Sequence, residues 1–167
     1  REYLLLDRID DAIAALTLSF DGIETTGTGP LADSATHLMQ ALSRKHLFDE
    51  VLKVAHRALT HAPKHPDIWF EYGQGLMNLG QLSAAADAYE KALSGLTEMG
   101  SEAQTSLVHH RWKAHEMLGL AYFKTQQYQA SYRAYLNALA SKPDATDGWP
   151  VLLNSACALA IELGDHE

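Results

Sequence analysis

A pattern of residue types recurs along this chain, and this recurrence constrains the fold more than any other feature. One copy reads Trp69-x-x-Tyr72-Gly73, then Ala85, then Tyr89-x-x-Ala92. The next copy lies 46 residues further on and reads His115-x-x-Leu118-Gly119, Ser131 and Tyr135-x-x-Ala138. A unit of this length cannot close a hydrophobic core by itself, so successive units stack against one another. The chain is therefore expected to form a solenoid.

The hydrophobic periodicity indicates that the repeated units are helical. Apolar residues recur at spacings of three and four throughout the 167 residues, and no stretch alternates as a β-strand does. Pro66 and Pro150 fall in expected first turns, while Pro63 and Pro143 follow expected helix ends. The predicted helices are 2–20, 31–45, 48–61, 66–79, 82–99, 102–125, 128–140 and 148–163.

This spacing resembles the tetratricopeptide repeat, a helix pair of 34 residues with Trp, Leu-Gly, Tyr, Ala, an aromatic residue, Ala and Pro at fixed offsets. The resemblance implies an all-α, right-handed superhelical solenoid of antiparallel helix pairs. It divides the single domain 1–167 into a half repeat 1–30, repeats 31–65, 66–100 and 101–145, and a half repeat 146–167. The first full repeat is degenerate, with Met39 and Val51 at sites that usually hold small residues.

Two segments depart from the regular spacing. Twelve additional residues separate the second and third repeats, because Ala92 and Ala138 are 46 residues apart rather than 34. Gly100 and the following Ser101-Glu102 read as a helix stop and a helix start, so the insertion is expected to lengthen both flanking helices. The stretch 21–30 is rich in Gly and Thr and is predicted to be an exposed loop.

Composition excludes several classes of function. A net charge of −8 opposes nucleic-acid binding, and no apolar run approaches the roughly 20 residues of a membrane span. The single Cys157 cannot form an internal disulfide, which favours a cytoplasmic location. The chain does not begin with Met, and we expect it to be part of a longer protein.

No catalytic constellation is present in the sequence, so we expect a protein that is not an enzyme and has no cofactor. Nine histidines include His109-His110, His115, and the pair His61 and His65, but their spacing matches no metalloprotease or zinc finger. No metal site is expected. A solvated, histidine-rich edge is the simpler interpretation.

The resemblance implies that the first helix of each pair lines a concave groove with its second, fifth, ninth, twelfth and thirteenth positions. In this chain those positions are Asp33, Thr36, Gln40, Ser43 and Arg44; Asp67, Phe70, Gln74, Met77 and Asn78; and Lys113, Glu116, Leu120, Phe123 and Lys124. The apolar members are surplus to the repeat pattern and predict a docking strip for a peptide or partner protein. The alternative is that the chain's own ends, or another domain, cover this strip.

We predict that the partner-binding residues are the following: Gln40, Arg44, Phe70, Gln74, Met77, Asn78, Leu120, Phe123 and Lys124. Chaperone-binding members of the family hold a terminal carboxylate with a clamp of Lys, Asn and Arg. The corresponding positions here are Thr36, Gln40, Glu71, Lys113 and Met117, so a chaperone tail is not expected as the ligand.

Two other roles remain open from the sequence. The long middle repeat resembles the tetratricopeptide tails of bacterial family 2 glycosyltransferases, and in that case the chain would be a non-catalytic region of a larger enzyme. A self-associating scaffold is the other alternative, because an unfinished stack leaves an apolar face open at each end and permits a homo-oligomer.

Overall fold

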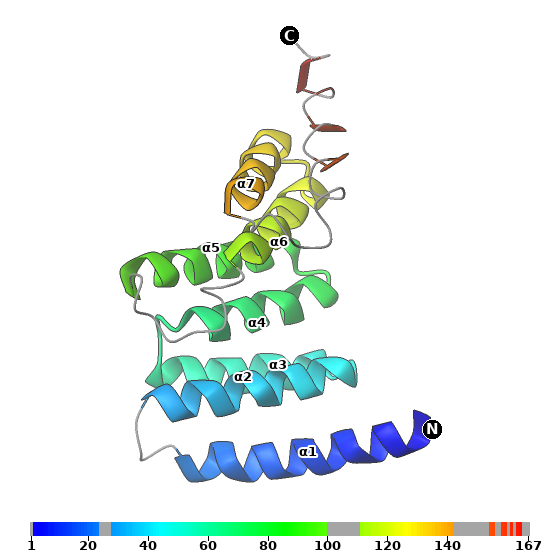
Figure 1. Cartoon of the computed structure of the whole chain (residues 1–167), viewed down its shortest axis with the longest axis vertical. Helices are drawn as coiled ribbons and strands as arrows, with labels where there is room; N and C mark the ends of the chain where they lie inside the picture. The colour runs from blue at the N-terminus through cyan, green and yellow to red at the C-terminus, as the bar shows by residue number, and fades with distance from the viewer. Residues whose placement is uncertain are drawn as a thin grey trace.

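The computed structural model describes residues 2–23, 28–99 and 111–141, together with positions 154, 155, 158, 159, 161, 163 and 164. Within these residues the chain forms seven α-helices and no strand. They are α1 (Glu2–Ile23), α2 (Thr28–Arg44), α3 (Phe48–His61), α4 (Pro66–Asn78), α5 (Leu82–Met99), α6 (Arg111–Lys124) and α7 (Tyr128–Ser141). Figure 1 shows them stacked in chain order, with α1 and α7 at opposite ends. The predicted all-α solenoid is confirmed.

The helix boundaries follow the sequence pattern closely. Helices α3 and α5 begin and end at the predicted residues, and α4 and α7 differ from prediction by one residue at one end. The predicted start of the sixth helix at position 102 lies outside the described residues, as does much of the predicted helix 148–163. The described positions between 154 and 164 are helical.

The predicted loop 21–30 is wrong at both of its ends. Helix α1 continues to Ile23 and α2 already begins at Thr28, so only positions 24–27 separate the described helices. Pro30 is the third residue of α2, where a missing backbone N–H leaves no intrahelical hydrogen bond unmade.

The turn inside each helix pair has the same geometry in all three repeats. His46, Gly80 and Gln126 have φ angles of 59°, 76° and 62°, in the left-handed region. The amide of the following residue donates to a carbonyl five residues back, as in the bond from Gln81 N to Leu76 O at 2.9 Å. These are the paired bonds of a Schellman motif, which ends the first helix and starts the second two residues later.

Small residues within each pair allow the second helix to approach the first. A Cβ atom added to Gly73 would lie 2.7 Å from Cε1 of Tyr89, and one added to Gly119 would lie 3.1 Å from the same atom of Tyr135. Ser131 takes the place of the usual alanine and is fully buried. Its hydroxyl donates to the carbonyl of Gly119 at 2.7 Å, so the extra polar group is satisfied.

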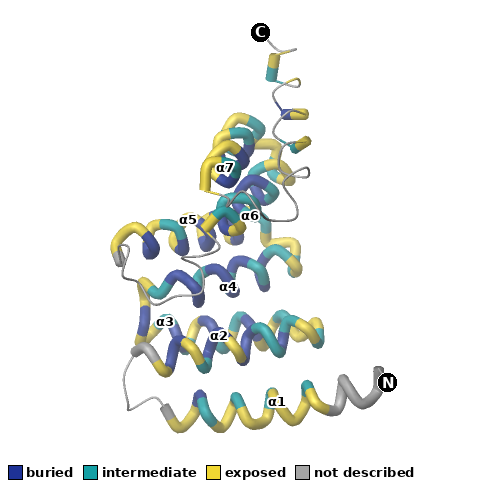
Figure 2. Tube along the Cα trace, in the orientation of Figure 1, coloured by how far each residue is buried: buried dark blue, intermediate teal, exposed yellow. Residues whose placement is uncertain are grey.

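Packing between consecutive helices produces a continuous stack. Helix α2 also contacts α4, which places the first helices of successive pairs in one layer. One buried cluster extends from α1 to α4 and a second from α4 to α7, and Tyr72 packs against both. In Figure 2 the buried positions run through α2 to α5, whereas α1 is exposed along most of its described length.

The insertion lengthens α5, as predicted. This helix has 18 residues, whereas the equivalent helices α3 and α7 have 14 each. The predicted extension of the next helix falls within positions 100–110, outside the described residues.

Candidate functional site

The predicted apolar strip divides into a buried half and an open half. Phe70 retains only 8% of its surface, and its ring centroid lies 5.7 Å from that of Tyr89. Met77 is partly buried and packs against the same cluster. The expectation that Phe70 faces water is therefore not met, because α6 stacks on α5 and supplies Ala114 to the cluster that includes Phe70.

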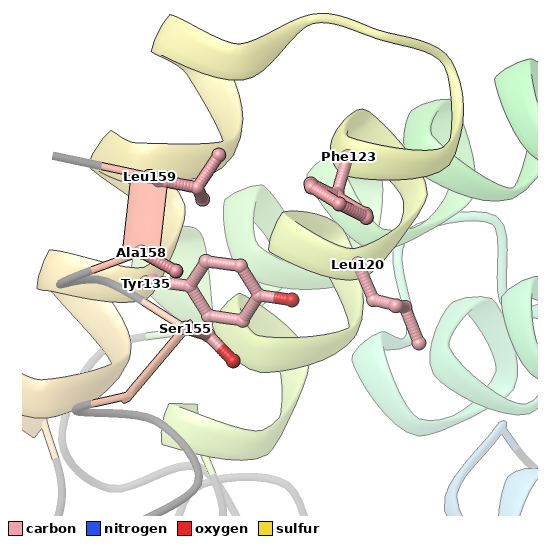
Figure 3. Close-up of a pocket in the computed structure, with 6 residues that line it drawn as sticks. All are labelled: Leu120, Phe123, Tyr135, Ser155, Ala158 and Leu159. Atoms are coloured by element: carbon pink, nitrogen blue, oxygen red, sulfur yellow. The ribbon is translucent and has the colours of Figure 1, made fainter. Parts of the chain in front are cut away.

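The other half of the strip borders a cavity of about 270 Å³. Leu120 and Phe123 of α6 form one wall, and Ser155, Ala158 and Leu159 form the other. Figure 3 shows the ring of Tyr135 between these walls, with its hydroxyl directed toward Leu120. Phe123 is 47% exposed, so this pocket opens to solvent beside an accessible aromatic ring. We call this space the apolar pocket.

Tyr135 contributes a polar group to this otherwise apolar lining. Burial raises the pKa of its phenol, the nearby charge of Glu116 raises it further, and a hydrogen bond with Ser155 opposes both effects. The phenol is therefore neutral at physiological pH and presents a hydroxyl rather than a charge.

The predicted polar groove residues differ in their exposure to solvent and in whether their side chains already bond to other parts of the chain. Arg44 and Lys124 are exposed and end their helices, and neither forms a salt bridge within the described part of the chain. The side-chain amide of Asn78 donates to the backbone carbonyl of Gln74 at 2.8 Å, so this side chain is hydrogen-bonded to its own helix. Gln74 is partly buried, and Gln40 donates to a buried acid on the next pair.

That acid is Glu71, the most unusual ionisable group in the described structure. It is 7% exposed, and its Oε1 accepts a hydrogen bond of 2.8 Å from Nε2 of Gln40. Burial raises the pKa of Glu71 to about 7, the Gln40 bond lowers it, the charge of Asp67 raises it, and that of Lys113 lowers it. The pKa of this carboxyl group therefore lies well above that of an ordinary glutamate, close to neutral pH.

Two histidines, His65 and His115, are partly buried and not fully solvated as expected. Burial lowers the pKa of His65 and of His115, although the charges of Asp67 and Asp33 partly offset this for His65. Both rings are thus neutral at pH 7. No group of three or more His, Cys, Asp or Glu side chains suited to a metal ion occurs among the described residues.

Sequence reasoning missed two parts of this surface. Tyr135 was considered only as a member of the repeated pattern, although the residue also lines the apolar pocket (Figure 3). Glu71 was considered only as a departure from the chaperone clamp. One signal could have identified Glu71: Asp67 lies four residues earlier on the same helix face, and like charges at this spacing repel.

Comparisons with known proteins agree with the repeat assignment. The sequence profile of the tetratricopeptide repeat matches residues 66–94 and 113–144. These two segments match the tetratricopeptide repeat. No curated protein matches the sequence.

Solved structures share the fold at low sequence identity. A crystal structure of MamA has a TM-score of 0.72 and 16% identity, covering 93% of this chain and 79% of MamA. The Sgt2 tetratricopeptide domain from Aspergillus fumigatus has a TM-score of 0.66 and 17% identity, covering 85% of each chain. The first such domain of Spaghetti (RPAP3), bound to the HSP90 peptide SRMEEVD, has a TM-score of 0.63 and 14% identity, covering 80% of this chain and 93% of that one.

No described helix is long and apolar enough to cross a membrane.

Proposed function

We propose that this chain is a non-catalytic, cytoplasmic interaction module that binds a peptide segment of a partner protein on its concave face. The observation that carries this proposal is the apolar pocket, in which two predicted groove residues, Leu120 and Phe123, border an open cavity of about 270 Å³. This volume accommodates one large apolar side chain. A structural neighbour with the same fold holds a peptide, which supports this type of ligand.

The polar residues around the pocket suit the backbone of a bound peptide. Lys124 follows Phe123 directly and is exposed, and the hydroxyl of Tyr135 lies at the pocket wall. A few apolar anchors supply most of the affinity in such interfaces, and polar neighbours fix the orientation of the ligand. We assign the anchoring role to Leu120 and Phe123 and the orienting role to Lys124 and Arg44.

The proposal is tested by comparing two exposed apolar residues of similar accessibility. Peptides are first selected from a displayed random library on the wild-type chain, and their affinities are then measured by calorimetry. Phe123→Ala is expected to weaken binding by about 2 kcal/mol, because it removes a wall of the pocket. Leu136→Ala is the control, since Leu136 is 43% exposed on α7 and does not line the pocket.

The melting temperature distinguishes binding from stability. Phe123 is nearly half exposed, so its truncation should change the melting temperature only slightly. Equal affinities for wild type and Phe123→Ala would overturn the proposal, and so would an equal loss in Leu136→Ala.

A further inference from the structure

A second cavity lies away from the apolar pocket, where the connection between α3 and α4 meets the second half of α5. Its volume is about 220 Å³, and it is open to solvent. Its polar and aromatic side chains are those of Lys64 in the connection, Trp69 in α4, and Lys91, Ser94 and Glu98 in α5. We call this cavity the Lys91 pocket. The sequence analysis assigned no binding role to any of these residues.

The backbone around this pocket is closely packed, which fixes the positions of its walls. A Cβ atom added to the buried Gly95 would lie 2.5 Å from the backbone oxygen of Lys64, so α5 approaches the connection as closely as glycine allows. On the other wall, Nε1 of Trp69 donates to the carbonyl of Pro63 at 2.7 Å. The indole ring and the connection are therefore held in place, and the pocket is formed before any ligand binds.

The two cations of the pocket differ in whether a carboxylate already balances them. Nζ of Lys64 donates to Oε2 of Glu98 at 2.7 Å, so these two charges offset each other. Nζ of Lys91 lies 4.3 Å from the centroid of the Trp69 ring, and Lys91 forms no salt bridge within the described part of the chain. A cation–π contact positions an ammonium group but leaves N–H donors available. The pocket therefore has one unbalanced positive charge, in a chain whose net charge is −8.

A hydroxyl without a partner lies on the same wall as this charge. Ser94 is three residues after Lys91, so the two side chains share one face of α5. Ser94 is exposed, and its hydroxyl makes no hydrogen bond to any residue that the structure describes. The ammonium group and the hydroxyl can both donate to one anion, while the indole of Trp69 offers an apolar surface to the carbon chain that carries the anion.

An anion fits this pocket better than a cation does. A cation would have to displace one lysine from Glu98 or the other from the face of Trp69, whereas an anion leaves both contacts in place. The other acids on this part of α5 are Asp87 and Glu90, and neither is among the residues that line the pocket. Glu90 instead accepts a hydrogen bond from the hydroxyl of Tyr122.

We propose that the Lys91 pocket binds the side-chain carboxylate of an acidic residue on a protein partner, with Lys91 and Ser94 as the donors. Pockets that enclose drug-sized ligands have volumes of about 300–1,000 Å³, so a cavity of about 220 Å³ suits one short side chain better than a whole small molecule. One carboxylate balances the one free charge, whereas a phosphate group would bring about two negative charges close to Glu98.

The test measures the binding of acetylglutamate methylamide to the whole chain at constant ionic strength, with the indole N–H signal of Trp69 as the readout. Acetylglutamine methylamide has the same shape without the charge and is the control probe. The glutamate probe is expected to shift this signal until it saturates, and the glutamine probe is expected to leave it unchanged. Equal shifts with the two probes would overturn the proposal. Tighter binding of the corresponding lysine or phosphoserine derivative would overturn it as well, because the ligand would then not be a carboxylate.

Matched substitutions test the two donors. Lys91→Gln should bind the glutamate probe about fivefold more weakly, and Ser94→Ala about threefold more weakly, because each removes one donor to the carboxylate. Lys91→Arg keeps the charge and the contact with the indole ring, so it should retain most of the binding. Lys53→Gln is the control, since Lys53 is an exposed cation on α3 that does not line the pocket. Unchanged binding by Lys91→Gln, or an equal loss in Lys53→Gln, would contradict the proposal.

The melting temperature and one further variant separate this site from stability and from the apolar pocket. Lys91 and Ser94 are exposed, so their substitutions should change the melting temperature only slightly. Phe123→Ala should bind the glutamate probe as the wild type does, because Phe123 is on α6 and does not line the Lys91 pocket. A failure of the apolar pocket as a binding site would therefore leave this result intact.

Discussion

At the scale of single residues, Gly73 and Gly119 set the distance between the two helices of their pairs. Each lies in van der Waals contact with a tyrosine of the second helix, Tyr89 or Tyr135. The contact is closer at Gly73, and Tyr89 is fully buried, so its ring has no room to move aside. An added methyl group is consequently more costly at Gly73 than at Gly119.

We therefore predict that Gly73→Ala destabilises the protein by about 1–2 kcal/mol. Overpacking costs about 1–3 kcal/mol, and the better helix propensity of alanine returns part of this. Gly119→Ala should lose less, and Gly22→Ala should be neutral or slightly stabilising, since nothing lies within 4 Å of an added Cβ there. Urea unfolding of the three variants measures these differences. Equal stabilities for Gly73→Ala and Gly22→Ala would contradict the packing argument.

The sequence predicted which residues would be small, but not the orientation of every large one. Gly73, Ala85 and Ser131 were recognised from their spacing, because only small side chains fit between the helices of a pair. Phe70 was expected on the open face, yet it turns against Tyr89. A position at the edge of a helix face can be covered by the next pair, and helical periodicity within one element does not contain that information.

At the scale of elements, the turn inside each helix pair fixes the register between its two helices. His46, Gly80 and Gln126 occupy equivalent positions and all have positive φ. Only one of them is glycine, the residue that adopts this conformation without steric strain. The left-handed conformation of the other two could not be predicted from residue type. It follows from the Schellman hydrogen bonds that all three turns share.

This repetition predicts that Gln126→Gly stabilises the protein by about 0.5–1 kcal/mol. The variant removes the strain of a side chain at φ 62°, and the turn hydrogen bonds involve only backbone atoms. Chemical denaturation measures the gain. Gly80→Ala, which introduces the same strain, is the reciprocal variant and should lose a similar amount. A loss of stability in Gln126→Gly would show that its side chain contributes more than the turn strain costs.

At the scale of the whole molecule, the charge is distributed unevenly along the solenoid. The chain carries −8 in total, yet α6 and α7 hold four cations and one acid, namely Arg111, Lys113, Lys124, Arg133 and Glu116. The acidic residues lie mostly in the earlier helices. The buried acid Glu71 lies on α4, whereas Lys124 on α6 directly follows Phe123, which lines the apolar pocket.

The stability of the whole chain should therefore depend on pH through Glu71. Its pKa is about 7 in the folded protein and 4.5 ordinarily, so the folded state holds this proton more tightly. As pH rises from 4.5 to 7, the unfolded chain loses the proton first, which lowers the free energy of unfolding; above pH 7 the effect is constant. Glu71→Gln lacks this titration.

The difference in unfolding free energy between Glu71→Gln and wild type is expected to shift in favour of the variant by up to about 3 kcal/mol across that range. Urea unfolding of both proteins at about pH 5 and about pH 8 measures this difference, and the other titrating groups cancel in the comparison. A difference that does not change with pH would mean that Glu71 titrates in the folded chain as it does in the unfolded one.

The identical turns inside the pairs have a further consequence for how this chain tolerates changes in length. The connection from first to second helix is the same in each pair, whereas the twelve additional residues lie between the second and third repeats, and part of them lengthens α5 to Met99. A residue added inside a pair would rotate every side chain of the second helix relative to its partner, because the turn fixes where that helix begins. Between pairs, an added segment leaves both registers intact. Grafted epitopes and linkers are therefore best placed between α5 and α6, and the turns at His46, Gly80 and Gln126 are best left at their natural length.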